Sequence, residues 1–99
     1  MKLNPRTQRR LDRIKDKVDI LALLEEFGFQ VRADMDREQQ FQCRLHGSGQ
    51  DNKPSARVYP ETSSWNCWAC QKSRDAVSTA REVLNLGFMD AIKWLEAKH

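Results

Sequence analysis

The spacing of cysteine and histidine residues constrains the fold of this chain more than any other feature. Cys43 and His46 are separated by two residues, as are Cys67 and Cys70, and 20 residues lie between the two pairs. Zn²⁺ prefers four tetrahedral sulfur and nitrogen ligands, and a tight turn can direct both members of such a pair at one ion. Four protein ligands leave no position open for water, so the pattern predicts one structural zinc ion and not a hydrolytic one.

Other interpretations of these residues imply different chemistry. Cys67 and Cys70 alone would suit a thiol redox pair, but no thioredoxin-like alternation of strand and helix surrounds them. A disulfide scheme leaves one of the three cysteines unpaired. No stretch resembles a signal peptide or a membrane span, so we expect a cytoplasmic protein, where disulfides are disfavoured.

The length and charge of the chain set further limits. With 99 residues, we expect residues 1–99 to form a single domain with a small core, which a metal ion would help to stabilise. The formal net charge is +3, and residues 1–20 carry seven basic and three acidic side chains. This charge is too weak to identify a nucleic-acid-binding protein by itself, and the basic segment 6–17 is interpreted more simply as a solvated helix face.

Hydrophobic periodicity changes along the chain from helix to sheet and back to helix. Residues 5–28 have helical spacing, with Asp19 as a possible second cap and Gly28 as a stop. In the sheet region 29–72, short alternating runs predict strands near residues 29–33, 39–43, 55–60 and 64–68. Helical spacing resumes over 73–97, with Ser73 as a possible cap and a break at Gly87. The predicted fold is α+β: a zinc ribbon with a small antiparallel sheet flanked by helices at both ends.

One face of the predicted ribbon combines basic and aromatic side chains. Alternation directs Arg57 and Tyr59 outward, whereas Ala56 and Val58 face the core. Such a face suits single-stranded nucleic acid, because cations meet phosphates and flat rings stack on bases. For each tryptophan taken singly, packing in the core or around the zinc is the simpler interpretation. The candidate DNA-binding residues are Lys53, Ser55, Arg57, Tyr59 and Trp65.

Several short motifs resemble the zinc-binding domain of bacterial and phage DNA primases of the DnaG type. They are "CRLH" at 43–46, "NKPSA" at 52–56, "WNCWAC" at 65–70, "VDILALLEEFGF" upstream and "LGFMDAIKWL" downstream. In that family the central runs read approximately Cys-Pro-Phe-His, Lys-Thr-Pro-Ser-Phe and Tyr-x-Cys-Phe-Gly-Cys. Three differences mark a divergent member, such as one from a phage or mobile element. The proline after Cys43 is missing, Ala56 replaces a phenylalanine, and Ser73-Arg74-Asp75 replaces the usual Gly-Gly-Asp.

The resemblance implies a role in DNA replication. Such a domain binds single-stranded template DNA and aids the initiation of primer synthesis, while a separate domain with clustered carboxylates polymerises. The acidic residues here are scattered, so we expect no catalytic site in this chain. The implied partners are template DNA, a primase catalytic core and a replicative helicase. The alternative is a protein-interaction module that docks onto a primase core, helicase or polymerase.

Overall fold

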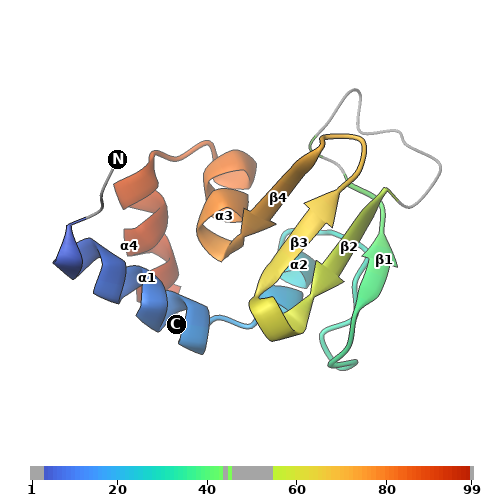
Figure 1. Cartoon of the computed structure of the whole chain (residues 1–99), viewed down its shortest axis with the longest axis horizontal. Helices are drawn as coiled ribbons and strands as arrows, with labels where there is room; N and C mark the ends of the chain where they lie inside the picture. The colour runs from blue at the N-terminus through green and yellow to red at the C-terminus, as the bar shows by residue number, and fades with distance from the viewer. Residues whose placement is uncertain (1–3, 44, 46–54, 99) are drawn as a thin grey trace.

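The computed structural model describes residues 4–43, 45 and 55–98. Two helices precede a four-stranded antiparallel sheet and two follow it, so the predicted α+β fold is confirmed. In Figure 1 the sheet lies at one end of the molecule with α2 behind it, and α1, α3 and α4 lie toward the other end. The elements are α1 (Pro5–Lys17), α2 (Ile20–Glu26), β1 (Gln39–Phe41), β2 (Ala56–Tyr59), the 3₁₀ turn η1 (Pro60–Thr62), β3 (Ser64–Cys67), β4 (Lys72–Asp75), α3 (Ala76–Leu84) and α4 (Phe88–Lys98).

Polar side chains cap the start of each of the first two helices. The Asn4 side chain accepts a hydrogen bond of 2.8 Å from the amide of Arg6 at the start of α1. The Asp19 side chain does the same for Leu21 at 3.0 Å, so a second helix begins where the sequence placed a second cap. Gly28 has a φ of 90°, a conformation that glycine adopts without strain.

Among the helices of the described residues, none combines the length and apolar sequence needed to cross a membrane.

The sheet is a meander in the order β1-β2-β3-β4. In the β2–β3 hairpin, Ala56 lies opposite Cys67 and Val58 opposite Trp65. All four of these side chains are fully buried, because residues opposite one another in an antiparallel pair share a face of the sheet. The other face carries Arg57, Tyr59, Ser64 and Asn66, which are partly exposed.

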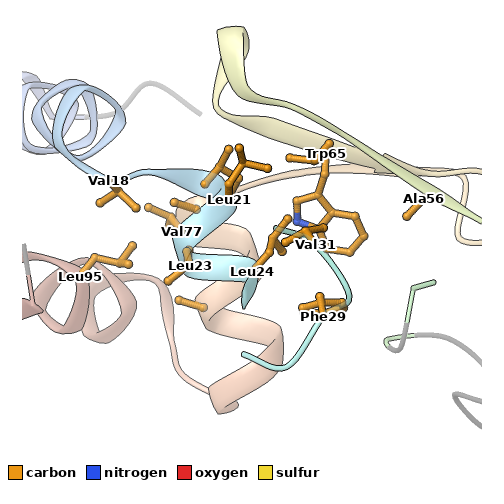
Figure 2. Packing of buried hydrophobic residues seen from close by; sticks show 14 of the residues in the cluster. Val18, Leu21, Leu23, Leu24, Phe29, Val31, Ala56, Trp65, Val77 and Leu95 are labelled. Carbon is orange, nitrogen blue, oxygen red and sulfur yellow. The ribbon is translucent and has the colours of Figure 1, made fainter. Parts of the chain in front are cut away.

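Trp65 lies at the centre of the core between the sheet and α2 (Figure 2). Its ring centroid is 5.6 Å from that of Phe29 and 5.3 Å from that of Phe41. Its indole Nε1 donates a hydrogen bond of 2.8 Å to the Thr79 hydroxyl on α3. The hydrogen bond gives this buried polar group a partner and ties the sheet to the third helix.

The strand predicted over residues 29–33 is wrong. Phe29 and Val31 do point into the core, but this segment forms no strand. The Gln39 side chain accounts for part of the difference, because its oxygen accepts from the Arg32 amide at 2.8 Å and its Nε2 donates to the Arg32 carbonyl at 2.9 Å. A side chain thus takes the bonds that a strand partner would have taken.

The boundary between the sheet and α3 also differs from the prediction. The segment beginning at Ser73 was expected to be helical, but Lys72–Asp75 form strand β4. Asp75 caps α3 in place of Ser73, and its side chain accepts from the Ser78 amide at 2.8 Å. The buried residue of β4 is Arg74, so the strand lacks the apolar alternation by which strands are predicted.

Candidate metal centre

Three cysteines converge at one end of the sheet. Cys43 follows β1, Cys67 ends β3, and Cys70 lies in the turn between β3 and β4. Their Sγ atoms all lie within 4.8 Å of one another, and those of Cys43 and Cys70 are 3.9 Å apart. Sulfurs bound tetrahedrally to one Zn²⁺ at about 2.3 Å lie about 3.8 Å apart, whereas a disulfide bond is about 2.05 Å long. The observed spacing therefore fits shared coordination of one ion.

Local backbone geometry shapes the turn that carries Cys70. The Trp68 amide donates to the Ser55 carbonyl at 2.9 Å, which fixes the start of the turn against the neighbouring chain segment. Gln71 has a φ of 54°, a left-handed conformation that reverses the chain toward β4. The Cys70 amide donates to the Cys67 Sγ at 3.4 Å, a contact that favours the thiolate form of Cys67.

The pKa values of the thiols indicate that the cluster needs a cation to hold its thiolates together. Burial raises the pKa of Cys43 to about 12. Burial also opposes ionisation of Cys67, but the Cys70 amide and further hydrogen bonds, including one with Ser55, lower its pKa to about 7. Three neighbouring sulfurs cannot all become anions without a cation between them. Zn²⁺ supplies that charge and prefers thiolate ligands, so the donor set fits one structural zinc ion.

Two of the predicted site residues lie outside the described part of the chain. They are His46, the expected fourth metal ligand, and Lys53, an expected DNA contact. Ser55 is partly buried, and its hydroxyl lies 3.8 Å from the Cys67 sulfur, beside the metal centre. Arg57 and Tyr59 lie on the solvent face of β2, and Arg57 forms an ion pair of 3.0 Å with Glu38.

The prediction that Trp65 contacts DNA is wrong, because its side chain is fully buried. Alternation within β3 correctly placed Trp65 and Cys67 on one face. The register between β2 and β3, which the sequence does not reveal, places that face with Val58 and away from Arg57. The exposed tryptophan is Trp68, which is 50% exposed within the Cys67–Cys70 turn.

The sequence gives no sign that a charged neighbour of the cluster is buried. Arg74 is buried and forms an ion pair with Glu82 of α3, and Lys72 lies 3.5 Å from the same carboxylate. A basic residue within a polar run gives no signal of burial. Only the pairing of Arg74 with Trp65 across β3 and β4 reveals that its side chain faces the core.

Comparison with known proteins extends these observations. The family model for the CHC2 zinc finger, a zinc ribbon of the DnaG type, matches residues 6–99. A DNA primase of Lactococcus lactis subsp. lactis (strain IL1403) is 36% identical over 53 residues, which cover 54% of this chain and 8% of the primase.

A solved structure resembles the fold as a whole. It is the crystal structure of the Aquifex aeolicus primase (zinc-binding and RNA polymerase domains), with a TM-score of 0.72 and 19% identity. The match covers 90% of this chain and 21% of the solved chain. At this identity the likeness establishes the fold, and the chain spans only a small part of either primase.

Proposed function

Because this chain belongs to the family of CHC2 zinc fingers, the DnaG-type zinc ribbons, we propose that it binds single-stranded template DNA and aids the initiation of primer synthesis. Residues 1–99 would act as a single primase-type domain with one structural zinc ion. The four ligands would be Cys43, His46, Cys67 and Cys70. Primer synthesis itself would belong to a catalytic core on a partner or on another part of a longer protein.

The observation that carries the proposal is the solvent face of the sheet beside the cysteine cluster. Arg57 and Tyr59 lie on this face at alternate positions of β2, and the Arg57 side chain is 40% exposed. Trp68 supplies an exposed ring at the metal end of the same hairpin. A cation with aromatic rings suits phosphates and unstacked bases of a single strand. Lys53 and Ser55 remain proposed contacts, and Trp68 replaces Trp65 as the stacking ring.

The ion pair between Arg57 and Glu38 permits a test in which two substitutions should change the affinity for DNA in opposite directions. We expect Arg57→Gln to weaken binding of a short single-stranded oligonucleotide, because a phosphate contact is lost. The slope of affinity against salt should fall by about 0.7, the value for one phosphate contact. Glu38→Gln should strengthen binding, because it releases Arg57 from its partner at 3.0 Å. Fluorescence anisotropy across a salt series measures both effects.

Arg32 provides a matched control for that experiment. It is an exposed arginine with its own carboxylate partner, Asp34 at 2.9 Å, and it lies in the loop before β1. Arg32→Gln removes the same charge and should leave oligonucleotide affinity nearly unchanged. Equal affinities for the wild type and Arg57→Gln, with equal zinc content, would exclude this face as the DNA site.

The exposed ring of Trp68 also suits the alternative function, docking onto a primase core, helicase or polymerase. Apolar docking would persist at high salt, whereas phosphate contacts weaken steeply as salt increases. Oligonucleotide binding that is absent at low salt, together with salt-resistant binding to a primase core, would favour this alternative.

A further inference from the structure

Arg74 lies buried beside the cysteine cluster, and we propose that it is a positioning residue of the metal centre. Its guanidinium would act as an internal counter-cation for the zinc–thiolate group. This role concerns metal binding and does not depend on DNA binding.

The strand register places Arg74 on the core side of the sheet. Arg74 lies opposite Trp65 across β3 and β4, and its side chain is 3% exposed. The guanidinium carbon lies 4.9 Å from the centroid of the Trp65 ring, within the range of a cation–π contact. Trp65 is itself fixed by the Thr79 hydroxyl, so Arg74 lies on a rigid surface.

Glu82 supplies only part of the charge that a buried arginine needs. Its carboxylate accepts from Nε and, at 3.2 Å, from Nη2 of Arg74. The same carboxylate is about one-third exposed and lies 3.5 Å from the ammonium group of Lys72. Glu82 therefore serves two cations, and a second anion near Arg74 would be favourable.

The cysteine cluster would supply that second anion, because Arg74 and Cys67 lie on the same face of the sheet at neighbouring pairs, with Arg74 opposite Trp65 and Lys72 opposite Cys67. Among the described residues, the buried Nη1 of Arg74 has no hydrogen-bond partner. Burial alone would lower the pKa of Arg74, but the hydrogen bonds with Glu82 and Cys70 raise it. Three thiolates and one Zn²⁺ leave one net negative charge, which a neighbouring guanidinium stabilises by hydrogen bonding.

In the family that the chain resembles, a glycine usually stands in place of Arg74, as the second residue of a Gly-Gly-Asp run. Glycine has no side chain and cannot supply this charge. Partners of metal ligands orient those ligands, and their loss typically lowers metal affinity about 10–100-fold.

The test is competition for Zn²⁺ between a chromophoric chelator and the full chain carrying single substitutions. We expect Arg74→Met to lower zinc affinity about 10-fold or more, and Arg74→Lys to lower it less because the charge remains. Glu82→Gln should leave affinity equal or higher, because it frees Arg74 and Lys72 to face the thiolates. A purely structural link between β4 and α3 predicts a loss in both Arg74→Met and Glu82→Gln, so the sign of the second effect distinguishes the two roles.

Two controls complete the experiment. Arg81→Met removes an exposed arginine from the same helix as Glu82 and should leave zinc affinity unchanged. The thiolate charge-transfer bands of the Co²⁺-loaded proteins report whether the ligand set is intact in each variant. Wild-type affinity in Arg74→Met, or equal losses in Arg74→Met and Glu82→Gln, would overturn the proposal. If Arg74→Met does not fold, a loss of affinity in Glu82→Gln still overturns it.

Discussion

At the scale of single residues, Trp65 connects the core to the metal centre. One edge of its indole donates to Thr79, and its face lies against the Arg74 guanidinium. The Thr79 hydroxyl also donates to the Asp75 carbonyl at 2.6 Å, so it bridges the last residue of β4 and the indole. Trp65 and Thr79 are fully buried. A polar group there that lost its hydrogen-bond partner could not bond to water instead, which would destabilise the fold.

Substitution of Thr79 tests this bridge. Thr79→Val keeps the shape of the side chain but leaves the Trp65 N–H without its partner and removes the hydroxyl bond to the Asp75 carbonyl. We expect it to lower the free energy of unfolding by about 1–3 kcal/mol, measured by denaturant titration of the zinc-loaded protein. In a Trp65→Phe background, which has no indole N–H, Thr79→Val should cost clearly less. An equal cost in both backgrounds would show that the indole contact contributes nothing.

At the scale of elements, the sequence predicts what depends on neighbours along the chain. The cap at Asp19 and the alternation of Arg57 with Val58 are confirmed because each depends on residues within a few positions. The pairing of Val58 with Trp65 depends on how two strands align, which alternation does not fix. Strand β4 was missed for a related reason, since its buried residue is charged and is stabilised by Glu82 and Trp65.

The start of α3 gives a prediction at this scale. The Asp75 carboxylate caps the helix by accepting from the Ser78 amide, so Asp75→Ala should lower the free energy of unfolding by about 1 kcal/mol. Asp75→Asn should retain most of that stability, because asparagine also caps well. Denaturant titration at fixed zinc concentration measures both. An alanine variant as stable as the wild type would show that the cap is dispensable.

At the scale of the whole molecule, the two ends of the fold are held differently. The helical end has its own links between distant parts of the chain, such as Arg10 of α1 with Glu96 of α4 at 2.6 Å. At the other end, Cys43 belongs to the segment after β1, whereas Cys67 ends β3 and Cys70 lies in the turn that follows it. One ion bound to all three would therefore join segments that lie 24 residues or more apart in sequence.

Removal of the metal should therefore affect far more than its ligands. Structural zinc contributes about 10 kcal/mol or more of apparent free energy in small domains, and whole domains are stable by only about 5–15 kcal/mol. We expect a chelator to abolish cooperative thermal unfolding and to shift the combined tryptophan emission to the red as the buried ring of Trp65 meets water. Zn²⁺ should restore both properties, whereas Mg²⁺, which prefers oxygen ligands, should not.

A variant without one metal ligand provides an independent check. Cys67→Ser should behave like the stripped protein even with zinc present. A metal-free protein with the melting curve and emission of the loaded one would show that the helical end and the aromatic core hold the sheet without an ion.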